Sequence, residues 1–174
     1  SLVLGDESGQ EIEKCRLVEK ILDKNLLCYH FQPIIDVENA NIFGYEALMR
    51  YEKNNNVTSD VNIENVPEDS INNLSLSPFD ILQCAESLGR LYDVEKHTFS
   101  GILNRIEEDE ESFNNKKVFI NSMPAYHLKG DDMTEVLDRL NNHNGQVVIE
   151  FTEESEVDDK TYDLLKSKFS SRNA

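Results

Sequence analysis

Residues 117–152 read KVFINSMPAYHLKGDDMTEVLDRLNNHNGQVVIEFT and contain two short apolar strands separated by an amphipathic helix. The runs VFI in the strand 117–121 and VVI in the strand 146–152 are continuously apolar, which is typical of parallel strands covered on both faces. Between them, over 131–142, apolar residues recur at helical spacing: Met133, Val136, Leu137 and Leu140. This strand–helix–strand order predicts parallel βα units and therefore an α/β fold.

Upstream of this unit the sequence predicts a pair of strands followed by two helices. Leu27–Ile35 and Ile42–Tyr51 are strand-like, and the turn-prone residues 38–41 separate them. Because the polar connection is short, we expect these two strands to be antiparallel neighbours. The helices begin at Ser77-Pro78, where Ser is a good N-cap and Pro suits the first turn, and near Val94.

The chain is long enough for one well-buried domain. Helices over 10–25 and 158–169 are predicted outside the strands already described. Residues 52–77 are polar and have little periodicity, so we interpret them as an inserted loop. We interpret residues 1–10 as a linker or tag remnant and 11–174 as the domain.

Composition excludes several classes of protein. The net charge is -17, from 34 acidic and 17 basic residues, so the chain repels phosphate backbones and we expect no DNA binding. No apolar run approaches the roughly 18 residues of a membrane-spanning helix, and residues 1–6 have no basic leader, so we expect a cytoplasmic protein. The three cysteines, Cys15, Cys28 and Cys84, form no C-x-x-C pair, and we expect reduced thiols, without a disulfide.

Each predicted strand carries a polar side chain that could belong to a site: Gln32, Glu46, Asn121 and Glu150. Taken singly, such a residue is more often a structural hydrogen-bonding group. Together they favour a site, because the carboxyl ends of parallel strands meet at one edge of a sheet and carboxylate and amide oxygens suit magnesium or manganese. Since side chains alternate along a strand, Glu46, Leu48 and Arg50 share one face.

Five segments, in order from about Ile12 to Glu153, resemble EAL domains, the bacterial cyclic-di-GMP phosphodiesterase family. They are Phe31-Gln32-Pro33-Ile34, Gly44-Tyr45-Glu46-Ala47-Leu48-Met49-Arg50, the helix from Ser77-Pro78 through Ala85-Glu86, Phe119-Ile120-Asn121-Ser122, and Val148-Ile149-Glu150-Phe151-Thr152-Glu153. A single segment would be weak evidence, but five in this order make a specific match.

The resemblance implies a partial TIM-like (β/α) barrel with an antiparallel first strand and about four of the usual eight strands. It implies that Glu46, Asn121 and Glu150 ligate Mg²⁺ or Mn²⁺. It also implies that Gln32, Leu48 and Arg50 bind the substrate, and that Glu153 anchors a downstream loop. In this family, two cations activate a water that cleaves cyclic-di-GMP to linear pGpG.

The sequence departs from the family after the fourth strand, where the family continues with an Asp-Asp-Phe-Gly motif and later catalytic residues. Asp158-Asp159 is followed by Lys160, and we interpret the pair as charges at a helix start. We therefore expect this chain alone to be inactive. Three explanations stay open: an engineered or proteolytic piece of an enzyme, a natural half-domain completed as a homodimer or strand-exchanged oligomer, or a chain whose later residues are disordered or deleted.

The alternative function is a degenerate, non-catalytic EAL module that binds cyclic-di-GMP or a protein partner in signalling. An open sheet edge would provide one route to such a partner, because unpaired backbone groups there can pair with another chain. A third outcome is a fragment without independent activity that folds only within something larger.

Overall fold

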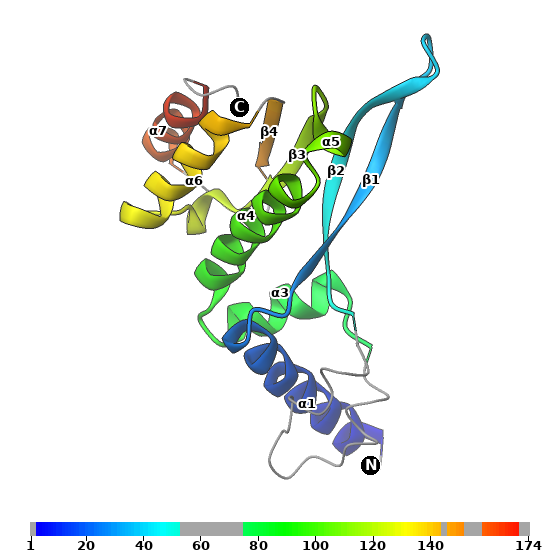
Figure 1. Ribbon diagram of the computed structural model, residues 1–174. Helices are drawn as coiled ribbons and strands as arrows, with labels where there is room; N and C mark the ends of the chain where they lie inside the picture. The colour runs from blue at the N-terminus through cyan, green and yellow to red at the C-terminus, as the bar shows by residue number, and fades with distance from the viewer. Residues whose placement is uncertain (1–2, 53–74, 144–145, 152–157, 171–174) are drawn as a thin grey trace. The chain divides into compact units, whose positions relative to one another are not determined.

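The computed structural model describes residues 3–52, 75–143, 146–151 and 158–170, with side chains from residue 9 onward. Its elements are α1 (Val3–Asp23), β1 (Cys28–Asp36), β2 (Asn41–Arg50), α3 (Pro78–Ser87), α4 (Leu91–Glu108), α5 (Glu110–Phe113), β3 (Lys117–Ser122), the 3₁₀ turn η1 (Pro124–Tyr126), α6 (Gly130–Asn142), β4 (Gln146–Phe151) and α7 (Asp159–Ser170). Figure 1 shows these elements along the chain. Within the described residues, no helix is both long and apolar enough to cross a membrane.

The described strands form one sheet in the order β1-β2-β3-β4. A four-residue turn joins β1 to β2 in a long hairpin (Figure 1), and so short a connection requires antiparallel strands. The Asp36 carboxylate stabilises this turn by accepting hydrogen bonds from the backbone N–H of Glu38 (3.0 Å) and the side-chain amide of Asn39 (2.7 Å). β3 pairs in parallel with both β2 and β4.

The predicted elements are confirmed with small differences in their bounds. The antiparallel strand pair, the βα unit and the helix that starts at Ser77-Pro78 are all present, and α1 begins at Val3 where we expected residue 10. Asp158 accepts a hydrogen bond from the Thr161 backbone N–H (2.9 Å), which confirms that it caps the start of α7. Most of the predicted insertion, residues 53–74, lies outside the described residues, and the domain limits stay predictions.

The chain divides into two compact units. The larger comprises residues 29–49 and 95–174 and contains most of the sheet. Its core lies on one face of β3 and β4, where Val118, Ile120 and Val147 are buried. Helices α4 and α6 lie side by side, linked by the ion pair between Arg139 and Glu107 (2.7 Å) (Figure 1).

Close approaches of the backbone explain two glycines of this unit. A Cβ at Gly44 would lie 2.6 Å from the Lys117 carbonyl oxygen, at the point where β2 begins to pair with β3. A Cβ at Gly101 on α4 would lie 2.5 Å from the ring of Tyr29, whose hydroxyl also donates to Thr98 (3.2 Å). Only glycine allows these elements to approach so closely.

The smaller unit comprises residues 1–28 and 50–94, and its helices α1 and α3 pack together. Lys14 and Asp80 form an ion pair (2.6 Å), and the Lys14 ammonium together with Ser77 lowers the pKa of Asp80 to about 2. Cys15 and Cys84 form a disulfide, so the expectation of three reduced thiols is wrong. The pairing could not be seen in the sequence because the two cysteines are 69 residues apart and only the packing of α1 on α3 joins them.

We predict that Cys15→Ala lowers the free energy of unfolding by about 4 kcal/mol, because the disulfide closes a long loop and restricts the unfolded chain. Urea unfolding without reductant measures the difference, and reductant should lower the wild-type stability toward that of the variant. Cys28, which is free, provides the matched control, and Cys28→Ala should leave the midpoint nearly unchanged. Equal midpoints for wild type and Cys15→Ala would contradict the prediction.

Candidate functional site

Three oxygen-bearing side chains lie on one face of three neighbouring strands. In the parallel register, Glu46 of β2 is opposite Phe119 of β3, and Asn121 of β3 is opposite Glu150 of β4. Since residues two apart on a strand share a face, Glu46, Asn121 and Glu150 share the face opposite to the buried Ile120 and its neighbours. We call these three residues the polar triad.

Within the polar triad, Asn121 contacts Glu46 and is the register partner of Glu150. The Asn121 side-chain nitrogen donates a hydrogen bond to the Glu46 carboxylate (3.3 Å), which leaves the Asn121 amide oxygen for another partner. Glu46 is half-buried, whereas Asn121 and Glu150 are exposed. Two carboxylates and an amide oxygen form a hard donor set, which suits Mg²⁺ or Mn²⁺ better than a soft metal.

The other predicted site residues are Gln32, Leu48, Arg50 and Glu153, and each lies in a different place. Gln32 is exposed on β1, and alternation places it opposite to Tyr29 and Phe31, which contact α4 and α5. Leu48 is two residues beyond Glu46 on β2 and so shares its face. Arg50 ends β2 and belongs to the smaller unit, and Glu153 lies outside the described residues. The functional roles of all these residues stay predictions.

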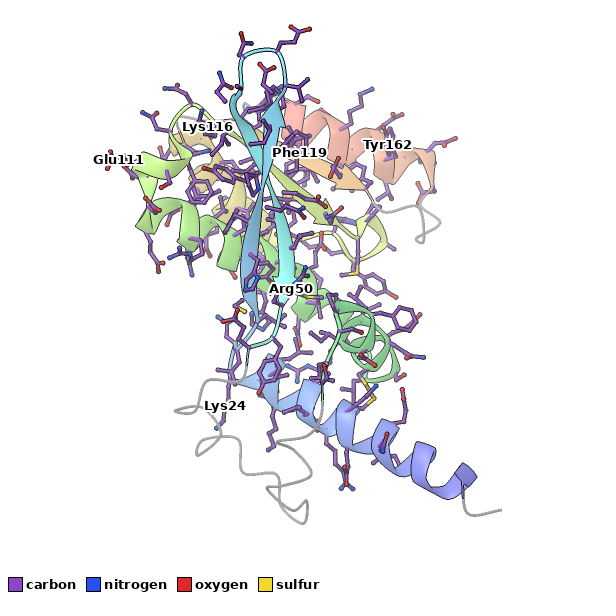
Figure 2. All side chains as sticks on the ribbon, turned by 90° about the vertical axis from the view of Figure 1, so that its right-hand side faces the viewer. Lys24, Arg50, Glu111, Lys116, Phe119 and Tyr162 are labelled. Carbon is purple, nitrogen blue, oxygen red and sulfur yellow. A yellow bond between two sulfur atoms is a disulfide. The ribbon has the colours of Figure 1, made fainter. Side chains whose placement is uncertain are left out.

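An aromatic and cationic cluster that we did not predict borders the polar triad. Phe119, labelled on β3 in Figure 2, lies two residues before Asn121, and its ring centroid is 6.5 Å from that of Phe43. The Lys117 ammonium lies 4.8 Å from the centre of the Phe43 ring. Alternation along β3 could have identified Lys117 and Phe119, because both share a face with Asn121.

A buried carboxylate, Glu95 of α4, lies on the opposite side of β3. It is 1% exposed, it hydrogen-bonds the Ser122 hydroxyl, and it accepts a hydrogen bond from the Met123 backbone N–H (3.0 Å). Burial raises the pKa of Glu95 to about 7, although both hydrogen bonds oppose the rise. The sequence held a signal for it, since Glu95 continues the apolar stripe of α4 four residues after Leu91 and four before Phe99.

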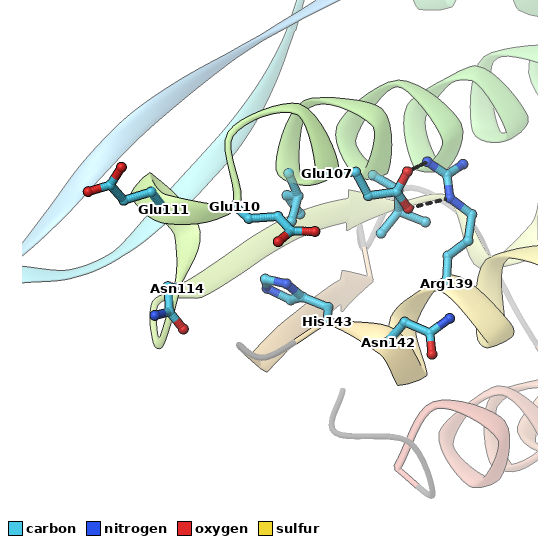
Figure 3. A pocket seen from close by; sticks show the side chains of 9 residues that line it. Glu107, Glu110, Glu111, Asn114, Arg139, Asn142 and His143 are labelled. Atoms are coloured by element: carbon cyan, nitrogen blue, oxygen red, sulfur yellow. Dashed lines mark hydrogen bonds and ion pairs between the residues drawn. The ribbon is translucent and has the colours of Figure 1, made fainter.

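A cavity of about 680 Å³ lies between α4, α5 and α6, away from the polar triad (Figure 3). Glu107 and Arg139 on its wall pair with each other through two contacts of 2.7 and 2.9 Å. His143 also lines it, and its Nε2 is buried with no hydrogen-bond partner among the described residues. Burial lowers the pKa of His143, and the nearby charge of Glu110 opposes this shift. His143 precedes β4, whereas Glu150 lies near the end of that strand, so the cavity is separate from the polar triad.

Comparisons with known proteins agree on one family. A family model described as EAL domain matches residues 15–171. A search of curated proteins gives no match. A crystal structure of an EAL domain protein from Listeria monocytogenes EGD-e is similar to the chain, with a TM-score of 0.58 and 17% identity over 87% of this chain and 53% of that chain.

Two further solved structures share the fold. Vibrio cholerae LapD, an S helix-GGDEF-EAL protein bound to c-di-GMP, has a TM-score of 0.58 and 13% identity, over 94% of this chain and 36% of that one. The Xanthomonas citri FimX EAL domain in complex with c-diGMP has a TM-score of 0.56 and 13% identity, over 99% of this chain and 59% of that one. The chain thus spans less than two thirds of each structure, and its open sheet fits the predicted partial TIM-like barrel.

We predict that Glu95 makes stability depend on pH. Its pKa is raised in the folded state, so the folded chain binds this proton more tightly than the unfolded chain does. The stability is therefore highest below the unfolded pKa and falls as the pH rises toward about 7. Glu95→Gln cannot ionise and should not lose this stability. The free energy of unfolding of the variant minus that of wild type should therefore rise by about 3 kcal/mol over this interval and then level off.

Urea unfolding of wild type and Glu95→Gln at a series of pH values measures this difference. Glu108→Gln changes an exposed glutamate of the same helix and should follow the wild-type curve. Parallel curves for wild type and Glu95→Gln would show that the buried carboxyl does not titrate as described.

Proposed function

Because this chain belongs to the EAL domain family, we propose that it contributes the nucleotide-binding face of a metal-dependent cyclic-di-GMP phosphodiesterase. The observation that carries this proposal is the polar triad, in which Glu46, Asn121 and Glu150 meet on one face of adjacent parallel strands. Two similar structures are described as bound to c-di-GMP, which supports the choice of ligand.

In this proposal the polar triad holds a divalent cation, either Mg²⁺ or Mn²⁺. Glu46, Asn121 and Glu150 would hold the cation, which would supply activation of a water and neutralisation of charge on the leaving oxygen of the phosphodiester. The hydrogen bond from Asn121 to Glu46 restrains both side chains before the cation binds, so less conformational entropy is lost on binding. A chain with net charge -17 also needs cations to accept an anionic nucleotide.

The remaining site residues would orient the nucleotide. Gln32 and Leu48 would border it on the strand face, the Arg50 guanidinium would bind a phosphate oxygen, and Glu153 would anchor a downstream loop. The rings of Phe43 and Phe119 offer flat apolar surfaces for a base. Lys117 adds a positive charge on the same face as Asn121.

The alternative is a binding module that does not hydrolyse the nucleotide. The Asp158-Asp159 pair does not supply the family's Asp-Asp-Phe-Gly motif, because Lys160 follows it and Asp158 caps α7. Binding of cyclic-di-GMP, or of a second copy of the chain as a homodimer or strand-exchanged oligomer, would then be its role. Under either proposal we expect the isolated chain to be inactive.

We predict that the chain binds Mn²⁺ and that Asn121→Ala weakens binding by about tenfold or more, because one ligand and one restraint on Glu46 are lost. Calorimetric titration with Mn²⁺ alone measures the affinity. Glu46→Gln should have a similar or larger effect, while Glu38→Gln, which neutralises an exposed glutamate in the turn of the same hairpin, should have little. Equal affinities for all four proteins would exclude the polar triad as the cation site.

We also predict that the chain binds cyclic-di-GMP without converting it to linear pGpG. Incubation with the nucleotide and Mg²⁺ or Mn²⁺, followed by anion exchange, detects any product, and calorimetry measures binding. Product formation that Glu46→Gln abolishes would instead establish this chain as a hydrolase. Absence of both binding and product would contradict both functions.

A further inference from the structure

A buried side chain of α4, that of Glu95, contacts the residues at the end of β3. Glu95 of α4 hydrogen-bonds the Ser122 hydroxyl with one carboxylate oxygen and accepts the Met123 backbone N–H with the other (3.0 Å). Ser122 is itself 2% exposed. These two partners directly follow Asn121, so Glu95 acts on the residues next to the polar triad without contacting the polar triad.

This contact has a geometric consequence for Asn121. Successive side chains of a strand point to opposite faces, so holding Ser122 toward α4 turns Asn121 toward Glu46 and Glu150. A shift of one residue would exchange the two faces and bury Asn121 against the helix. In the described part of the chain, the last paired residues of β3 and β4 are Ser122 and Phe151. The next backbone N–H, that of Met123, donates a hydrogen bond to the Glu95 carboxylate.

Burying a carboxyl group costs more free energy than burying an apolar side chain, unless the carboxyl group forms hydrogen bonds that offset the cost. Glu95 forms hydrogen bonds with two groups at once, the Ser122 hydroxyl and the Met123 N–H. Glutamate reaches both with its two oxygens. Glutamine can do the same, because its oxygen can accept from Met123 while its nitrogen donates to Ser122, whereas leucine fills the space and satisfies neither.

We propose that Glu95 is a positioning residue of the polar triad: by holding Ser122 and Met123, it fixes the end of β3 so that Asn121 faces Glu46 and Glu150. This inference rests on the proposed function, because it assigns Glu95 a role in a cation site that is itself proposed. Its structural part, the orientation of Asn121, is testable without any metal.

The first measurement uses the ¹⁵N-labelled, metal-free chain above neutral pH. We expect Glu95→Leu to move the two side-chain amide signals of Asn121 toward those of a freely exposed asparagine, and to speed hydrogen exchange of the Met123 N–H about tenfold or more. Glu95→Gln should preserve both signals. The matched control Glu108→Leu, an exposed glutamate of the same helix, should change neither.

The second measurement is Mn²⁺ affinity by calorimetry. Glu95→Leu should bind Mn²⁺ about tenfold more weakly than wild type, and Glu95→Gln should restore most of the affinity. A role limited to stability would instead lower the unfolding midpoint of Glu95→Leu while Mn²⁺ affinity and the Asn121 signals stay at their wild-type values. That result would overturn the proposal.

The two proposals fail in different ways. If wild type binds no Mn²⁺, the cation site is wrong, and the Asn121 signals of the metal-free variants still decide the positioning role. If Glu95→Leu does not fold, Ser122→Ala takes its place, because it removes one of the two contacts and leaves the Met123 contact intact. Ser122→Ala should then shift the Asn121 signals partway, and unchanged signals would reject the positioning role.

Discussion

The parallel register of β2, β3 and β4 is the constraint on which the rest of the larger unit depends. With Glu46 opposite Phe119 and Asn121 opposite Glu150, side-chain alternation gives the sheet two chemically different faces. One carries buried apolar residues such as Val118, and the other carries the polar triad. Because the side-chain period is two, a shift by a single residue would bury the polar groups and expose the apolar ones.

Several local features maintain that register. Gly44 permits the backbone of β2 to approach that of β3 where their pairing begins. At the other end, Glu95 forms hydrogen bonds to Ser122 and Met123 where β3 ends. The strand pairing is therefore restrained at both ends of β3: at its start by Gly44, which has no side chain, and at its end by the buried side chain of Glu95.

Electrostatics connects the site to the whole chain. A net charge of -17 disfavours any anionic ligand, and the two carboxylates of the polar triad would repel it locally as well. A divalent cation reverses that field, and Lys117 adds a positive charge on the same sheet face as Asn121. In the proposed function, the same carboxylates that repel a free phosphate would bind one through a metal.

The amino-acid sequence alone was sufficient for the element order, the antiparallel hairpin, the βα unit and the family, because apolar periodicity, turn residues and short motifs are local patterns. It also indicated Glu46, Asn121 and Glu150 as a group, since each ends or interrupts an apolar strand. The sequence did not predict the disulfide of Cys15 with Cys84 or the burial of Glu95 under β3. The spacing along α4 places Glu95 on the apolar face of the helix, but packing between residues distant in the chain determines which neighbour that face meets and whether Cys15 meets Cys84.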